Sequence, residues 1–443
     1  MKKTIIASLL LASFTGSFVP VYAENSNQLE TNSAVNSSES WLTAGNQVGF
    51  KTWLPSLMQT FNRLPEVAAQ EAKRTQAQLS IKAADQAIYN PELGVDYQNA
   101  DTDTYTLGIS QTIDWGDKRG AATRIAQLQA EILLSDITLE RSQLLAATIQ
   151  ALVEQSQSRK ALEFQQQQLD SAKRSLYIAK QQLQVGDLSS VALQLVQLDV
   201  ASRAADYAIA EQASIAADAN VLMLLGDSKQ AFTSFISALA LPTSSTQVDP
   251  ELPALKSAYQ QVMLTKLNAQ QVKADTSVDP TISLSAEREG EENKLGIGVS
   301  IPLQIRNNYS DTLAVASQEI AIAEQTYLAQ ERVLRQQQKK FELSLPRLTK
   351  RYQDWRELVL NSGHEAASGL TQQWRAGDIE TSVYLQSQRQ LSTSYLAGLS
   401  LETALYTSWL EWMGVSGQLE AYLQAQLPAS AVADARQSAS AKY

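Results

Sequence analysis

The sequence predicts a mainly α-helical fold that also contains transmembrane β-strands. Its plan is a duplicated unit in which a helix is followed by a β-hairpin, a long helix and a returning helix. Three observations predict this fold: similar motifs recur about 190 residues apart, short segments alternate between apolar and polar residues, and long segments carry apolar residues at seven-residue steps. The duplication defines the plan of the chain, and the two periodicities identify its strands and helices.

The N-terminus has the features of a signal peptide. It starts with a basic segment (MKK), continues with an apolar stretch from Ile5, and reaches a small-residue cleavage site at Val21-Tyr22-Ala23. We therefore expect residues 1–23 to be removed during export. A polar extension follows at 24–46. The Asn/Ser/Glu-rich composition of residues 24–40 within it, like that of the Ala/Ser-rich tail after Pro428, predicts disorder.

The composition excludes several classes of protein. The 443-residue chain contains no cysteine, so disulfides, thiolate metal sites, cysteine nucleophiles and a lipid-bearing N-terminal cysteine are excluded. The single histidine, His364, leaves no His-based metal site or catalytic triad, and we expect it to be a solvated helix residue. The net charge of −10 argues against nucleic acid. We therefore expect no enzyme, no cofactor and no metal site.

No membrane-spanning helix is expected either, because no stretch after the signal peptide approaches 18 consecutive apolar residues. A membrane location, if there is one, must then come from β-strands.

The duplication rests on three pairs of motifs. Asn90-Pro91 and Asp279-Pro280 open the two units, "LGISQTI" at 107–113 matches "IGVSIPL" at 297–303, and "QQLQVGDLSSV" matches "QQWRAGDIETS" 191 residues later. The predicted repeat 1 is 47–226, with strands at about 91–115 and a long helix at about 117–185. The predicted repeat 2 is 251–416, with strands at about 280–304 and a long helix at about 308–375. A linker at 227–250 joins the repeats, and a C-terminal segment with a flexible tail follows at 417–443.

Each repeat contains a hairpin whose strands have one apolar and one small or polar face. In the opening strand, Tyr105, Leu107 and Ile109 alternate with Thr106, Gly108 and Ser110, and only Gln111 interrupts the apolar face. This pattern is typical of transmembrane β-strands, which are apolar toward lipid and polar toward a lumen. A half-buried hairpin of a soluble sandwich would show the same alternation, but the signal peptide and the four strands together favour the membrane.

Four strands cannot close a barrel, because open strand edges are not tolerated in lipid and known membrane barrels have eight strands or more. The chain must therefore borrow strands from copies of itself, and a ring of three gives twelve strands. The sequence thus predicts a homotrimer in contact with membrane lipid.

The long helices show sustained heptads. In repeat 2 the apolar positions fall at seven-residue steps from Leu313 to Trp355, and the helices are otherwise rich in Ala and Gln. A broad, uncharged face of this kind suits a helix that contacts neighbours on both sides, as in the wall of a tube. A run of this length extends about 100 Å. Pro346 interrupts the second long helix, and we expect a bend there.

Each long helix must reverse at its far end. Gly186 and Gly377 suit the left-handed position after a helix, and Asp187 and Asp378 suit the N-cap of the returning helix. A strand that leads directly into a helix of this length would join a membrane barrel to a tube that crosses the periplasm.

With these features the chain resembles the TolC-like outer-membrane efflux family over roughly Leu54 to Gly414. The resemblance rests on "NPEL" before the first strand, "WGDKRGAA" after the second, "IPLQIRNN" in repeat 2, and the turns "VGDLSS" and "AGDIETS". The "DKRGA" and "PL…RNN" motifs are most similar to the heavy-metal branch of that family, the cobalt–zinc–cadmium and copper–silver type channels.

The resemblance implies a trimeric 12-stranded outer-membrane β-barrel that is continuous with a 12-helix periplasmic α-barrel. It also implies an inner-membrane pump, most simply of the RND type, and a periplasmic adaptor (membrane fusion protein). The adaptor would dock at the tip and gate residues, which are carried over as Val185, Gly186, Asp187, Leu188, Ala376, Gly377, Asp378 and Ile379. The implied function is an outer-membrane channel that exports metal ions or small toxic compounds.

Several alternatives remain open from the sequence. The channel could serve drug efflux or type I protein secretion, and a more distant alternative is a periplasmic coiled-coil structural protein, which would explain the heptads but neither the paired hairpins nor the duplication. An adaptor would carry one helical hairpin, whereas this chain has two. The five methionines are scattered along the chain and form no soft-metal relay.

Overall fold

The structure is a computed structural model that describes residues 40–227, 230–242 and 248–427. The chain forms two units, Met1–Gly45 and Asn46–Tyr443, and the description below concerns the second. The predicted signal peptide, the polar extension up to residue 39 and the predicted tail after Pro428 lie outside the described residues.

Four strands form one antiparallel sheet in the order β1-β2-β3-β4. They are β1 (Glu92–Gln98), β2 (Thr104–Thr112), β3 (Thr281–Glu289) and β4 (Glu292–Ser300). Each repeat contributes one hairpin, and the hairpins join through the β2–β3 pair, in which Ile109 faces Leu284. Residues as far apart in the sequence as Thr112 and Thr281, which are separated by 169 positions, thus lie side by side in one sheet.

The register aligns the apolar side chains of all four strands on one face. Leu93, Ile109, Leu284 and Ile297 are direct neighbours across the sheet, and the next row contains Val95, Leu107, Ala286 and Leu295. These side chains are exposed in the single chain, from 50% for Ile109 to 85% for Leu295. The opposite face carries small residues at its centre, in the row Gly94, Gly108, Ser285 and Gly296.

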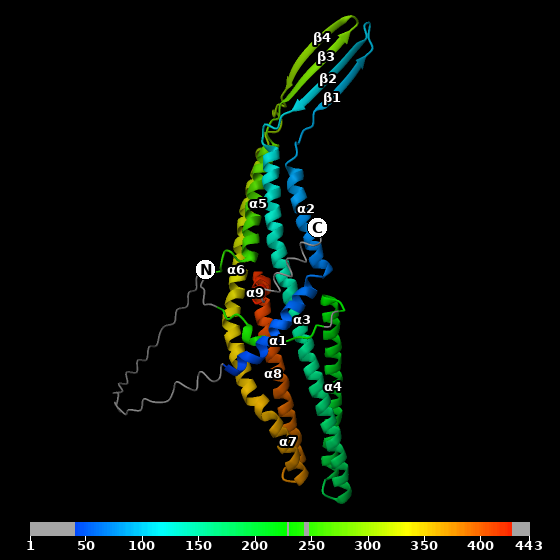
Figure 1. The fold of residues 1–443 in the computed structure, drawn as a ribbon, viewed down its shortest axis with the longest axis vertical. Helices are drawn as coiled ribbons and strands as arrows, with labels where there is room; N and C mark the ends of the chain where they lie inside the picture. The colour runs from blue at the N-terminus through cyan, green and yellow to red at the C-terminus, as the bar shows by residue number, and fades with distance from the viewer. Residues whose placement is uncertain (1–39, 228–229, 243–247, 428–443) are drawn as a thin grey trace, which may run out of the picture. The chain divides into compact units, whose positions relative to one another are not determined.

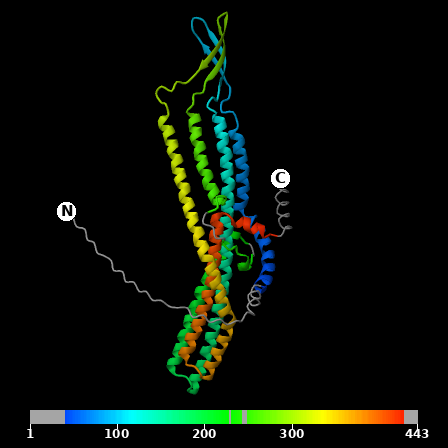
Figure 2. The same cartoon turned by 90° about the vertical axis from the view of Figure 1, so that its left-hand side faces the viewer.

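The helices follow the same plan twice. Repeat 1 contains α2 (Pro65–Ala84), α3 (Lys118–Val185) and α4 (Ser190–Leu225), and repeat 2 contains α5 (Pro253–Asp275), α6 (Ser310–Trp355), α7 (Asn361–Ala376) and α8 (Thr381–Ser416). The 68 residues of α3 extend about 100 Å, and α3 packs against α2, α4, α5 and α8. Both views place the strands at one end of this unit and the α3–α4 and α7–α8 turns at the other (Figures 1 and 2).

The second long helix contains an irregular segment after Trp355, and the bend expected at Pro346 stays a prediction. Pro346 lies inside α6, which continues to Trp355, and the hydrogen-bonding pattern changes to π-helical only at η2 (Arg356–Leu360). The adjacent packing accounts for this position. The Trp355 ring lies directly on Gly398 of α8, where a Cβ atom would come within 1.8 Å of it, and Trp355 Nε1–H donates to the Ser394 carbonyl at 2.8 Å. The π-helical segment therefore begins directly after the Trp355 contact with α8, not at Pro346.

The main hydrophobic core lies where α1 (Ser40–Phe61), α3, α8 and α9 (Leu419–Ala425) meet the segment at 230–242, which contains the short 3₁₀ helix η1 (Ile236–Ala238). Trp409, Tyr406, Phe61 and Phe235 are fully buried there. The Tyr406 hydroxyl accepts a hydrogen bond from the Phe235 backbone N–H at 2.7 Å, so the segment between the two repeats is held against α8.

Candidate functional site at the strands, the junction and the tip turns

The first tip turn connects α3 to α4. Gly186 has φ 85° and follows the helix as its left-handed C′ residue, which confirms the predicted role of this glycine. The backbone N–H groups of Gly186 and Asp187 donate to the carbonyls of Leu183 and Gln182 at 3.2 and 2.8 Å. These bonds form a Schellman motif, which satisfies the last free carbonyls of α3.

The second tip turn repeats this geometry between α7 and α8. Gly377 has φ 80°, and the N–H groups of Gly377 and Asp378 donate to the carbonyls of Trp374 and Gln373 at 3.1 and 2.9 Å. Because both turns require a positive φ at one position, glycine is the residue that adopts each of them without strain.

The predicted N-cap role of the two aspartates is wrong. Asp187 and Asp378 occupy the second position after the helix, where their backbone N–H closes the Schellman motif. The N-cap of α4 is instead Ser189, whose side chain accepts from the Ala192 N–H at 3.1 Å. At α8 the N-cap position is Glu380, without a side-chain cap bond. The Ser that directly precedes the apolar period of α4 was the sequence signal for this cap.

The remaining tip residues divide into two groups. Val185 is 71% exposed, and Gly186, Asp187, Ala376, Gly377 and Asp378 are exposed as well. In contrast, Leu188 and Ile379 are half-buried and pack against a small cluster composed of Ala179, Val196, Trp374, Tyr384 and Leu385. The tip turns therefore have an outer surface and an anchoring side, a division that hydrophobicity alone does not predict.

Two polar links connect the helical hairpins near the tips. The Ser175 hydroxyl of α3 lies 3.2 Å from the Tyr384 hydroxyl of α8, and the Tyr384 ring stacks on Trp374 with centroids 4.6 Å apart. Farther from the tips, the buried Asp199 of α4 lies 3.5 Å from Arg389 of α8. The two hairpins are thus held together by side chains from both repeats.

A buried ion pair lies at the junction between strands and helices, and the sequence analysis did not identify it. Lys118 Nζ at the start of α3 lies 2.6 Å from Asp279 Oδ2, next to β3, and their side chains are only 13% and 6% exposed. The Tyr89 hydroxyl donates to the same oxygen at 2.7 Å, and the Trp115 N–H donates to Oδ1 at 3.2 Å. The pair therefore joins the two repeats where each hairpin leads into its helix.

The junction favours the charged forms of both groups. Burial opposes the charge on Asp279, but hydrogen bonds from Lys118 and Tyr89 and the Lys118 charge outweigh it and lower the pKa of the carboxyl. Burial likewise opposes the Lys118 charge, yet hydrogen bonds and attraction from Asp279 and Tyr89 raise the pKa of the ammonium. The only position at which the sequence hinted at this site was the Asp279-Pro280 pair that opens repeat 2.

Among the described residues, no group of three or more His, Cys, Asp or Glu side chains is arranged to hold a metal ion. The side chain of His364 lies outside the described residues. Within the described part of the chain, α4 alone is long and apolar enough by composition to cross a membrane. It packs along α3 and carries the buried Asp199 and Arg203, so we interpret its exposed apolar side chains as a packing surface.

Comparison with known proteins gives consistent results. Residues 57–227 match the family model described as outer membrane efflux protein, and no curated protein matches the chain. Among solved structures the chain is similar to CusC, with 13% identity, a TM-score of 0.68, and 84% of this chain and 92% of that chain covered. It is also similar to CmeC of Campylobacter jejuni, with 12% identity, a TM-score of 0.68, and 87% and 90% covered. A third similar structure is the open state of MtrE of Neisseria gonorrhoeae, with 14% identity, a TM-score of 0.66, and 83% and 89% covered. These likenesses confirm the predicted mainly helical fold of the single chain, whereas the trimer and its closed barrels stay predictions.

Proposed function

We propose that the chain belongs to the outer membrane efflux protein family, whose model matches residues 57–227, and that three copies form a channel through the outer membrane that continues as a helical conduit in the periplasm. Membership in this family would place the chain in the outer membrane and make it a transport protein rather than an enzyme. The proposal adds the trimer, the docking partners and the exported substrate.

The observation that carries the proposal is the two-faced, open sheet. One face is apolar and exposed on all four strands, the other is small or polar, and β1 and β4 are edge strands. Open edges are not stable in lipid, so β4 of one copy must pair with β1 of the next until a ring closes. Exposed aromatic residues stand near both ends of the apolar face, Tyr97 and Tyr105 at one end and Trp115 at the other, as in the aromatic girdles of membrane barrels.

The helices support the same assembly. α4 exposes a series of large apolar side chains that no other part of the described chain covers, namely Val191, Leu195, Leu198, Ile209, Ile215, Leu222 and Met223. In water such a surface is favourable only against a partner. Two helical hairpins per copy give twelve helices in a trimer.

The assembly is tested by electrophoresis and fractionation. We expect a trimer that resists mild detergent without heating, sediments with the outer membrane and forms ion-conducting pores in planar bilayers. A monomer in the periplasmic fraction would instead support a coiled-coil structural protein and would refute the channel.

We propose that the tip turns bind a periplasmic adaptor, which connects the channel to an RND-type inner-membrane pump. The exposed residues Val185 and Ala376 are the appropriate positions for a test. Val185→Asp together with Ala376→Asp should leave trimers intact and abolish adaptor cross-linking and efflux. The comparison variant is Leu188→Asp together with Ile379→Asp. It places charge against the buried tip cluster and should therefore also lower the stability of the turns. Normal cross-linking in the first double variant would contradict docking at this surface.

For the substrate we propose metal ions or small toxic compounds, on the basis of the "DKRGA" and "PL…RNN" motifs. Because the described residues contain no metal-binding cluster, selectivity would lie in the pump. Deleting the chain should therefore sensitise cells to divalent or monovalent heavy metals. Sensitivity to drugs alone would indicate drug efflux, and loss of a secreted protein would indicate type I secretion.

A further inference from the structure

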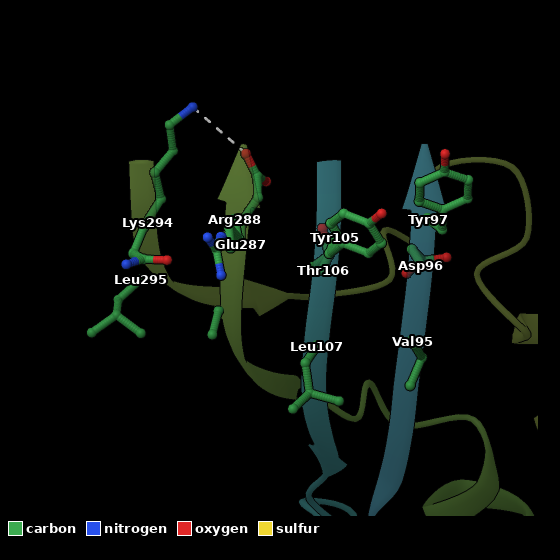
Figure 3. A pocket seen from close by; sticks show the side chains of 12 residues that line it. Val95, Asp96, Tyr97, Tyr105, Thr106, Leu107, Glu287, Arg288, Lys294 and Leu295 are labelled. Atoms are coloured by element: carbon green, nitrogen blue, oxygen red, sulfur yellow. Dashed lines mark ion pairs between the residues drawn. The ribbon is translucent and has the colours of Figure 1, made fainter. Parts of the chain in front are cut away.

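The apolar face of the sheet contains a groove near the hairpin end. Ala286 stands between Leu107 and Leu295 in the row that begins at Val95. Its short side chain leaves a depression of about 430 Å³ between the longer neighbours. Figure 3 shows Val95, Leu107 and Leu295 around this space, with the rings of Tyr97 and Tyr105 beyond them toward the hairpin loops. The apolar and aromatic side chains of this face share the lining with Arg288 and Asn293, and with Asp96, Thr106, Glu287 and Lys294, which alternate with them along the strands.

Arg288 lies in the row directly beyond that of Ala286. Tyr97, Tyr105, Arg288 and Asn293 are neighbours in that row. Among the residues of β1–β4 that share the apolar face, Arg288 alone carries a charge. Its Nε–H donates to the Gly290 carbonyl at 3.2 Å, and no acidic side chain of the described residues forms an ion pair with its guanidinium. Most of its five donors are therefore available.

The nearby acidic residues do not neutralise this cation. Glu287 and Glu289 flank Arg288 in β3 and so belong to the opposite face, where both pair with Lys294. Asp103 lies at the β1–β2 loop and accepts hydrogen bonds from Tyr97 and Asn99 at 3.2 and 3.1 Å. The sheet thus separates the paired lumen-side charges from a single unpaired charge on the lipid side.

A lipid-facing cation is costly at the membrane midplane but tolerated at the headgroup level, where tyrosine is also enriched. We propose that Arg288 and the Ala286 groove bind lipid A, the phosphorylated and multiply acylated glycolipid of the outer leaflet. One acyl chain would lie over Ala286, and a phosphate would accept two hydrogen bonds from the guanidinium. The inference rests on the proposed function, because the barrel orientation places the hairpin loops at the outer leaflet.

The binding test uses purified, delipidated trimers and measures lipid A by native mass spectrometry. Wild type should bind added lipid A, and Arg288→Gln should weaken this binding at least about tenfold, as expected for a lost charge-assisted bond. Ala286→Leu should fill the groove and also weaken binding. The matched control is Arg119→Gln, which removes an exposed positive charge at the start of α3, outside the groove, and should bind lipid A like wild type.

Two further arms identify the ligand chemistry. Arg288→Lys should recover only part of the affinity, because a point charge replaces a planar fork. Wild type should bind dephosphorylated lipid A and phosphatidylethanolamine at least about tenfold more weakly than lipid A.

Equal lipid A binding by wild type and Arg288→Gln, or equal binding of dephosphorylated lipid A, would overturn the proposal. A trimer that loses stability with unchanged lipid binding would show that Arg288 contacts a neighbouring copy instead. The conductance of the same samples separates the two claims. Conducting trimers without phosphate-dependent lipid binding refute the lipid site alone, whereas non-conducting monomers refute the proposed function as well.

Discussion

Asp279 accepts hydrogen bonds from three groups of the other repeat: the Lys118 ammonium, the Tyr89 hydroxyl and the Trp115 backbone N–H. Asp279→Asn leaves the Lys118 ammonium buried without its counter-charge. Removing one partner of a buried pair typically costs about 3–5 kcal/mol, so we expect a loss of that order in the free energy of unfolding per chain. Thermal unfolding followed by circular dichroism measures it.

The control for this variant is an exposed pair near the same junction. Arg119 and Asp85 lie 3.1 Å apart, and their side chains are 50% and 58% exposed. Asp85→Asn should therefore cost only about 0–1 kcal/mol. Equal losses in the two variants would mean that burial does not strengthen the junction pair.

The junction also predicts a pH dependence. The pKa of Asp279 is lowered in the folded chain, so its stabilising contribution is fully present above the unfolded pKa and is lost as pH falls through the lower folded pKa. Wild type should therefore lose stability below about pH 4. Asp279→Asn should lack this part of the acid transition, and an unchanged acid profile in the variant would contradict the assignment.

At the scale of elements, the strands allow the most direct test of inside and outside. Ile109 lies in the central apolar row, whereas Ser110 lies on the opposite face beside Ser283. Charge on the lipid face costs about 2–4 kcal/mol per chain at midplane, so Ile109→Arg should impair membrane assembly. Ser110→Arg should assemble and change conductance. If outer-membrane yields of the two variants were equal, the assignment of the faces would be wrong.

The π-helical segment offers a second test at this scale. A Cβ atom on Gly398 would overlap the Trp355 ring, so Gly398→Ala must displace that ring and break its hydrogen bond to Ser394. Overpacking of this kind costs about 1–3 kcal/mol. We expect lower thermal stability and changed Trp fluorescence. Pro346→Ala is the contrasting variant and should leave η2 in place. An unaltered Trp355 signal in Gly398→Ala would contradict the packing explanation of η2.

The strands and helix ends could be predicted from sequence because their causes are local. Alternation fixes the face of Ile109, and a left-handed turn needs glycine at 186 and 377. The features that the sequence did not predict correctly depend either on residues far away in the chain or on how many residues the turn contains. Ser189 rather than Asp187 is the N-cap of α4, because the Schellman motif that ends α3 includes Asp187 as well as Gly186. The sequence alone could not indicate that Lys118 meets Asp279, 161 residues away, or that Leu188 faces a cluster from both repeats.

At the scale of the whole molecule, each copy has two tip turns with the same backbone geometry. A trimer would therefore present six of these turns at the periplasmic entrance. The two aspartate side chains are exposed, and within the described residues neither forms a side-chain hydrogen bond or ion pair. Because their backbone N–H groups rather than their carboxylates stabilise the turns, the charges are available for another role.

We expect one ring of these aspartates to point into the lumen, where acidic rings favour cations. Asp187→Asn and Asp378→Asn keep the backbone bonds of the turns and should leave trimer stability unchanged. The variant that removes the lumen ring should lose cation selectivity and multivalent-cation block in planar bilayers. Ser189→Ala is the contrasting variant. It should lower stability by about 0.5–2 kcal/mol per chain, because α4 loses its N-cap, and it should leave cation selectivity unchanged. If both Asn variants discriminate ions like wild type, the constriction lies elsewhere along the helices.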